Sequence, residues 1–212
     1  MCGCWRREST VNPQIWESLI PCAWDYEYEY TNRGGFGLGQ WTNVGSSHGR
    51  LWNLHTYVTS LGYSDGDGYG QLEFVVAEDY WTPKSEAHLG YQNLADFLQS
   101  DSTSLDDLVW DFLACWEGVT GDHYTERLEW ANKILGYINE HENDGIAYAW
   151  IGRNGYLSEN EIYNNSMVVY QYICNHDAPV PPTPPTPTTT LLWLIIAMKK
   201  NNERRLKPYV RN

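Results

Sequence analysis

The chain has 212 residues, of which 42% are hydrophobic and 19% are charged, a composition typical of a globular domain and not of a disordered chain. The formal net charge of -13 excludes the basic surface that nucleic acids require, so no nucleic-acid partner is expected. The aromatic residues are mostly 11 Trp and 16 Tyr, against 4 Phe. Trp and Tyr combine a flat apolar face with a polar group, which suits stacking on sugar rings, although several of them must build the core.

The cysteines and histidines form no metal-binding pattern. Cys2 and Cys4 lack a second pair of ligands at zinc spacing, and none of the 6 His belongs to a His-Glu-x-x-His or His-x-His motif. We therefore expect no metal, no cofactor and no zinc peptidase activity, and we expect the cysteines to be free thiols. A cysteine amidase needs an activated thiol, and no flanking motif supports Cys22 or Cys115 in that role.

The first predicted element is a short helix that ends in Glu8, before an Asn-Pro turn at residues 12–13. This order places a carboxylate at a helix end, at the lip of a pocket. The segment WDYEYEY at residues 24–30 alternates acids with tyrosines and predicts a strand in a small sheet near residues 20–42. The glycines of GGFGLGQWT at residues 34–42 permit tight turns and the close approach of a ligand.

Beyond residue 47, the spacing of apolar residues predicts helices. The first helix carries one buried stripe: Leu51, Leu54, Val58 and Leu61. Gly62 is a natural end for it, and SDGDG at residues 64–68 is a loop. The period of residues 71–79 does not decide between a short helix and a strand.

Three more helices are expected, and the clearest begins at Ser104, which can cap it together with Asp107. Gly118 and Gly121 interrupt this helix after a continuous apolar face: Leu105, Leu108, Val109, Phe112, Leu113 and Trp116. The next helix, at about residues 124–138, carries a second stripe: Leu128, Ala131, Leu135 and Ile138. A last helix is expected over residues 158–173.

The C-terminal part has the composition of a spacer followed by a tail. The sequence PVPPTPPTPTTT at residues 179–190 predicts an extended polyproline-type linker. An apolar run at residues 191–198 precedes a basic stretch at 199–211. This run is far shorter than the roughly 20 residues that span a bilayer, so no membrane span is expected. The tail is either a docking peptide or a weak interfacial anchor, or it has no role.

Two motifs resemble the phage tail lysozyme family of the lysozyme-like superfamily. ESTVNP at residues 8–13 is similar to the end of the family's catalytic helix, and GFGLGQWT at residues 35–42 is similar to its glycine-rich Gln-Trp signature. Weaker similarity continues through these residues, so that the resemblance covers roughly residues 1–138: Arg50, Gln71, Glu117 and Arg127. It implies a mainly α, lysozyme-like α+β fold, a helical domain with a small β and glycine-rich segment beside the active-site cleft.

The activity that the resemblance implies is hydrolysis of peptidoglycan between N-acetylmuramic acid and N-acetylglucosamine. A glycosidic oxygen leaves only when it is protonated, so the enzyme needs a carboxylic acid that stays neutral near pH 6 to 7. We expect Glu8 to be this acid, because burial against aromatic side chains favours the neutral form. Four tryptophans are available for that wall: Trp5, Trp16, Trp24 and Trp41. The residues expected to contact substrate are Gly37, Gln40, Trp41 and Thr42.

The second carboxylate is not assigned by the motifs. In animal lysozymes an Asp lies shortly before a Tyr-Gly-x-x-Gln segment, and here Gly35 stands at that place. Asp25, or Glu27 or Glu29 in its stead, could activate water across the ring and give inversion at a separation of about 6.5 to 9.5 Å, unless these acids are only a solvated strand face. A lytic transglycosylase with a lone Glu, and a non-catalytic glycan-binding or structural tail protein, therefore stay open.

The N-terminus departs from the family pattern, since only seven residues precede Glu8. We expect a truncated start to a catalytic domain at residues 1–145, followed by a helical extension at 146–178, the linker at 179–190 and the tail at 191–212. YLSENEIYNNS at residues 156–166 resembles the missing leading helix, so the extension could take its place as in a permuted domain. The expected partners are peptidoglycan and, through the tail, other phage tail proteins. The expected location is the virion or the host cell wall during infection, after synthesis in the bacterial cytoplasm.

Overall fold

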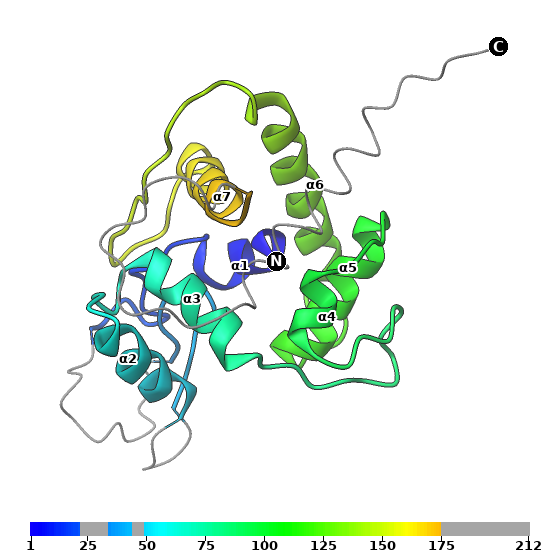
Figure 1. Cartoon of the computed structure of the whole chain (residues 1–212), viewed down its shortest axis with the longest axis horizontal. Coiled ribbons are helices and arrows are strands. Elements are labelled where there is room, and N and C mark those ends of the chain that lie inside the picture. The colour runs from blue at the N-terminus through cyan, green and yellow to red at the C-terminus, as the bar shows by residue number, and fades with distance from the viewer. Residues whose placement is uncertain (22–33, 44–48, 175–212) are drawn as a thin grey trace.

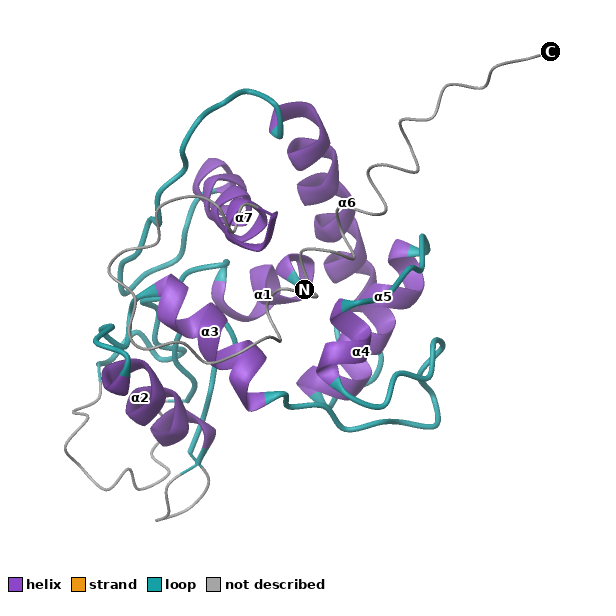
Figure 2. Ribbon diagram, viewed as in Figure 1, coloured by secondary structure: helices purple, strands orange, loops and turns teal. Residues whose placement is uncertain are grey.

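The computed structural model describes residues 1–21, 34–43 and 49–174, and this part of the chain is helical (Figure 1, Figure 2). The elements are α1 Cys2–Ser9, α2 Arg50–Ser60, α3 Gly68–Glu78, α4 Leu94–Leu98, α5 Leu105–Phe112, the π-helical turn η1 Leu113–Glu117, α6 Tyr124–His141 and α7 Glu159–Cys174. Within these ranges the β structure consists of two isolated antiparallel bridges, which join Phe36 to Trp16 and to Trp41. The prediction of a mainly helical fold is confirmed. The strand predicted at residues 24–30 lies outside the described residues.

Helix α1 lies near the middle of the molecule and packs against α6 and α5 (Figure 1). Cys4 and Trp5 are completely buried. Gly3 allows α6 to approach closely, because a Cβ at this position would lie 2.7 Å from the Ala131 side chain and from the Arg127 carbonyl oxygen. A helix of eight residues is marginal on its own, so this packing stabilises it.

Helices α2 and α3 largely follow the sequence pattern. The predicted stripe of α2 is buried at Leu51, Leu54 and Val58, and Gly62 follows the helix at φ 82°. Of residues 71–79, for which the period did not decide, residues 71–78 belong to helix α3 and Asp79 is its C-cap. The Asp67 side chain caps α3 by accepting hydrogen bonds from the backbone N–H groups of Tyr69 and Gly70.

The helix predicted from Ser104 is correct at its start and irregular at its end. Ser104 Oγ accepts a hydrogen bond of 3.2 Å from the Asp107 N–H, which caps α5. The last turn widens into η1 before Gly118 ends it in the left-handed conformation at φ 77°. Such π-helical turns are rare and frequent at functional sites. Here the turn places Glu117 directly after four buried residues, 113–116.

The register predicted for α6 is partly wrong, because Leu135 is 43% exposed. The buried positions follow a different stripe: Arg127, Trp130, Ala131 and Ile134. The predicted stripe was built from apolar residues alone, so it could not include the buried Arg127 on the inner face of α6. The short helix α4 was not predicted, since its five residues are too few to show a period.

Helix α7 and the chain before it belong to the same core as α1. Leu157, Ile162 and Val169 lie in one apolar cluster with Trp5 and Val11.

Polar contacts add to this packing. The Asn165 amide donates to the Val11 carbonyl at 2.8 Å, and the Asn12 amide donates to the carbonyl groups of Arg153 and Gly155 at 2.7 Å each. Residues 151–169 therefore support the turn that follows Glu8. In the part of the chain that the structure describes, no helix is long and apolar enough to cross a membrane.

Candidate active site

Glu8 lies in the last turn of α1 and accepts a short hydrogen bond from Nη2 of Arg127, with which it forms an ion pair. The side chain of Arg127 is 1% exposed, whereas that of Glu8 is 29% exposed. Arg127 also donates from Nη1 to the Cys4 carbonyl at 3.1 Å and from Nε to the Asp122 carbonyl at 3.0 Å. The guanidinium is therefore fixed in the interior of the protein, where it binds the Glu8 carboxylate. Part of the Glu8 side chain stays accessible to solvent.

The chain turns sharply directly behind Glu8. Thr10 and Val11 both adopt left-handed backbone conformations, at φ 53° and 54°. This conformation is a genuine outlier for β-branched residues, and such strain is concentrated at functional sites. The Ser9 hydroxyl lies 3.0 Å from the Trp5 carbonyl oxygen and 2.9 Å from that of Leu38, so the helix end is joined to the glycine-rich segment.

Gln71 of α3 brings the two motifs together. Its buried side chain accepts a hydrogen bond from the Leu38 N–H at 2.9 Å and donates to the carbonyl groups of Pro13 at 2.7 Å and Asp65 at 2.6 Å. Gly37 at φ 74° leaves room for this amide, because a Cβ there would lie 2.6 Å from Gln71 Oε1. The segments at 8–13 and 35–42, which the sequence paired only by resemblance, are thus neighbours in space.

The four residues predicted to contact substrate differ in their accessibility. Gly37 is buried and Trp41 is 1% exposed, so in this structure Trp41 contributes to the core. Gln40 and Thr42 are partly exposed. Gln40 Nε2 donates to the Gly37 carbonyl at 2.9 Å, and its Oε1 is enclosed without a hydrogen-bond partner among the described residues. Substrate contact by these four residues stays a prediction.

Two of the tryptophans expected to form an aromatic wall around Glu8 contact a third tryptophan that the sequence analysis did not assign to it. Trp5 and Trp41 each contact Trp116 edge to face, with ring centroids 6.2 and 6.4 Å apart. Trp16 instead packs on Phe36. Trp24 lies outside the described residues. Trp116 belongs to the predicted apolar face of its helix, so its burial was predicted. Its contact with Trp5 was not predicted.

Glu117 is a second carboxyl in this region. Burial, and then the nearby Glu8, raise its pKa to about 8, which outweighs the opposing effect of Arg127. Its Oε1 is enclosed and has no hydrogen-bond partner within the described ranges. Sequence similarity singled out Glu117 and Arg127 without giving either a role. The predicted second carboxylates, Asp25, Glu27 and Glu29, lie outside the described residues.

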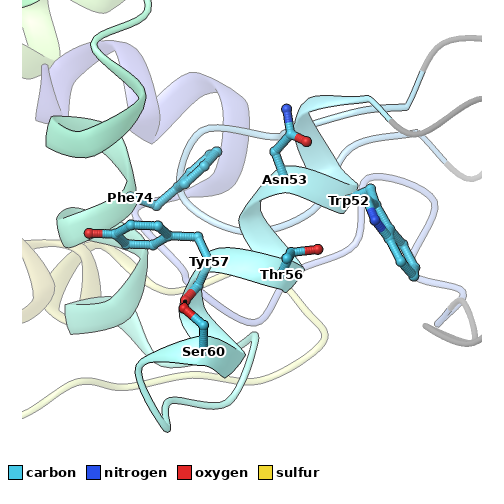
Figure 3. Close-up of a pocket in the computed structure, with 6 residues that line it drawn as sticks. All are labelled: Trp52, Asn53, Thr56, Tyr57, Ser60 and Phe74. Carbon is cyan, nitrogen blue, oxygen red and sulfur yellow. Dashed lines mark hydrogen bonds between the residues drawn. The ribbon is translucent and has the colours of Figure 1, made fainter. Parts of the chain in front are cut away.

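A pocket of about 590 Å³ lies along α2 (Figure 3). Figure 3 shows Tyr57 and Phe74 together at one end and Trp52 at the other. The remaining lining residues carry amide or hydroxyl groups: Asn53, Thr56 and Ser60. Phe74 also contacts Trp41, with ring centroids 5.7 Å apart, so aromatic contacts connect this pocket to the glycine-rich segment.

Among residues 1–21, 34–43 and 49–174, no group of three or more His, Cys, Asp or Glu is placed to hold a metal ion. The prediction of free thiols is confirmed for Cys2, Cys4 and Cys115.

A family model described as phage tail lysozyme matches residues 1–138. No curated protein and no solved structure matches the chain. The matched range includes Glu8, the glycine-rich segment, Glu117 and Arg127, and it ends before α7. The family indicates a lysozyme-like enzyme of the glycosidase type, associated with phage, whose substrate is peptidoglycan. With a match over most of its length, the chain belongs to the phage tail lysozyme family.

Proposed function

We propose that this protein cleaves the glycan strand of peptidoglycan between N-acetylmuramic acid and N-acetylglucosamine, with Glu8 as the general acid. The observation that carries the proposal is the position of Glu8. It is a partly accessible carboxyl at the end of α1, held by the buried Arg127 and placed next to the glycine-rich segment.

The chemistry requires a proton donor whose position is fixed. A glycosidic oxygen becomes a good leaving group when a carboxylic acid protonates it as the bond to the anomeric carbon breaks. The strained turn at Thr10 and Val11 and the hydrogen bonds of Arg127 restrict where Glu8 can lie. Gln40 and Thr42, the accessible members of the predicted substrate set, can supply hydrogen bonds to sugar hydroxyl or acetamido groups.

The pocket along α2 supports a glycan as the substrate. It combines aromatic rings with amide and hydroxyl groups, which is the combination that binds sugars through stacking and hydrogen bonds. In this proposal, sugar units distant from the cleaved bond contact Trp52 and Tyr57.

For the second carboxylate we retain the prediction that Asp25 activates water, with Glu27 or Glu29 as substitutes. A lytic transglycosylase would need no such base and would release an anhydro sugar. We further propose that the protein is a tail component that acts locally on the host wall, and that residues 179–212 tether it to other tail proteins.

The test compares wild type with Glu8→Gln on purified peptidoglycan. Glu140→Gln on the exposed face of α6 is the matched control. Loss of a general acid lowers kcat by about 10²- to 10⁴-fold, so Glu8→Gln should lose activity to this extent while the control keeps it. A folded Glu8→Gln protein with wild-type activity would contradict the proposal. A folded wild type that binds peptidoglycan without cleaving it would indicate a non-catalytic glycan-binding protein.

A further inference from the structure

The turn that ends α1 fixes the backbone of Glu8. The Thr10 N–H donates to the Arg6 carbonyl at 3.0 Å, and the Val11 N–H donates to the Trp5 carbonyl at 3.4 Å. These two bonds close the last turn of α1, in which Glu8 lies. Opening of the turn would therefore release the main chain that carries the Glu8 carboxylate.

The turn has a conformation that its own residues do not favour. Thr10 and Val11 are both β-branched, and both lie at positive φ, which such residues rarely adopt. A strained backbone persists only where the surrounding structure over-determines it. Helix ends also fray easily, so contacts from other parts of the chain have to hold this turn.

One of these contacts comes from a buried amide on α7. Asn165 is completely buried, and its Nδ2 donates to the Val11 carbonyl at 2.8 Å and to the Ile151 carbonyl at 2.7 Å. Its Oδ1 accepts a hydrogen bond of 2.9 Å from the Ile151 N–H. The side chain of Asn165 therefore joins the strained turn to the chain that precedes α7.

The neighbouring contacts to the turn come from the same part of the chain. The Leu157 N–H donates to Thr10 Oγ1 at 3.1 Å. The Asn12 amide donates to the Arg153 and Gly155 carbonyl groups at 2.7 Å each. All of these partners lie beyond residue 138, where the family match ends. The segment at 151–165 thus holds the end of the predicted catalytic helix from outside the matched range.

We propose that Asn165 is a positioning residue for the proposed reaction. Through Val11 it holds the turn that ends α1, and so it fixes the main chain of Glu8, whereas Arg127 binds the carboxylate. Both constraints set where the proton donor lies relative to the glycosidic oxygen, and the rate of catalysis depends steeply on such placement. This inference rests on the proposed role of Glu8 and extends the catalytic machinery to α7.

The test compares wild type, Asn165→Ala and Gln171→Ala on solubilised peptidoglycan strands, well below the thermal unfolding transition of each protein. Gln171 is the matched control, because its amide also joins α7 to the preceding chain. Its hydrogen bonds go to the Ile146 carbonyl at 2.6 Å and the Tyr148 N–H at 3.1 Å, and not to the turn.

We expect Asn165→Ala to lower kcat by about 10- to 100-fold and to leave KM within about twofold of wild type. A displaced acid weakens binding of the transition state and leaves binding of the substrate nearly unchanged, so the loss should appear in kcat. Gln171→Ala should keep both constants within about twofold of wild type.

Hydrogen exchange of backbone amides tests the same contact without turnover. The Thr10 and Val11 amides should exchange at least about tenfold faster in Asn165→Ala than in wild type, because the turn opens locally. The amides of Leu54 and Val58 in α2 should change much less, since α2 belongs to a different part of the fold. Gln171→Ala should leave the exchange at the turn unchanged.

A second variant applies if Asn165→Ala does not fold. Thr10→Val keeps the β-branched shape and removes only the acceptor of the Leu157 N–H, so kcat should fall by about threefold with unchanged KM.

Three outcomes would overturn the inference. Faster exchange at the turn with wild-type kcat would show that the turn does not position the acid. Unchanged exchange would show that Asn165 does not hold the turn. An equal fall of kcat in Gln171→Ala would indicate general destabilisation. A wild type without activity would instead refute the proposed function, and the exchange rates would still decide whether Asn165 holds the turn.

Discussion

Replacing Glu117 by Gln should change how the stability of the protein depends on pH. The pKa of this carboxyl is about 8 in the folded protein and takes its ordinary value of 4.5 in the unfolded chain. Between these two values the folded state binds more protons than the unfolded state, so the free energy of unfolding falls as pH rises. The stabilisation is complete below pH 4.5, declines through the interval and is lost above about pH 8.

The gap between 4.5 and about 8 sets an upper limit of about 5 kcal/mol for this effect. Water that enters around an ionised carboxylate reduces the cost, so we expect about 2 to 5 kcal/mol. Glu117→Gln cannot ionise, and it should therefore equal wild type near pH 4.5 and exceed it by this amount near pH 8.5. Urea unfolding of both proteins at about pH 4.5, 6.5 and 8.5 measures the difference at each pH. A difference that does not change with pH would refute the reasoning, because it would show that Glu117 is already ionised in the folded protein.

Three further predictions concern the scaffold and the substrate surface. Gln71→Leu removes three hydrogen bonds, two of them buried, and leaves their partners unpaired, so the free energy of unfolding should fall by about 3 kcal/mol, and a change below about 1 kcal/mol in urea unfolding would contradict this. Deleting residues 156–178 removes Leu157, Ile162 and Val169 from the core and should abolish the thermal unfolding transition, whereas a retained transition would show that α7 does not complete the domain. Trp52→Ala should raise KM for long glycan strands several-fold with little change in kcat, and an unchanged KM would exclude this pocket from substrate binding.

The sequence predicted those elements that are determined by residues close together in the chain. Ser104 could be identified as a helix cap and Gly62 as a helix end because capping and termination depend on neighbouring residues. The position of Glu8 at the end of a helix also followed from the short motif around it. The stripe of α2 was visible because its buried positions are all apolar.

What could not be predicted depends on contacts between distant segments. The inner face of α6 contains Arg127, whose burial is compensated by the Glu8 carboxylate and the Cys4 carbonyl group, both more than a hundred residues away in the chain. An analysis of hydrophobic periodicity assigns a charged residue to the solvent-facing side of a helix, so the predicted buried face of α6 was displaced from the observed one. Glu117 has no local signal either, because nothing in the neighbouring sequence indicates that its Oε1 is enclosed in the folded protein.

The most direct test of the central claim is the identity of the products that the purified protein releases from peptidoglycan. New reducing ends on N-acetylmuramic acid, identified by mass and absent with Glu8→Gln, are the result that this account predicts. Anhydro ends would show a lytic transglycosylase, and reducing ends on N-acetylglucosamine would show that the other glycosidic bond is cut. Free amino groups without new sugar ends would contradict glycosidase activity altogether.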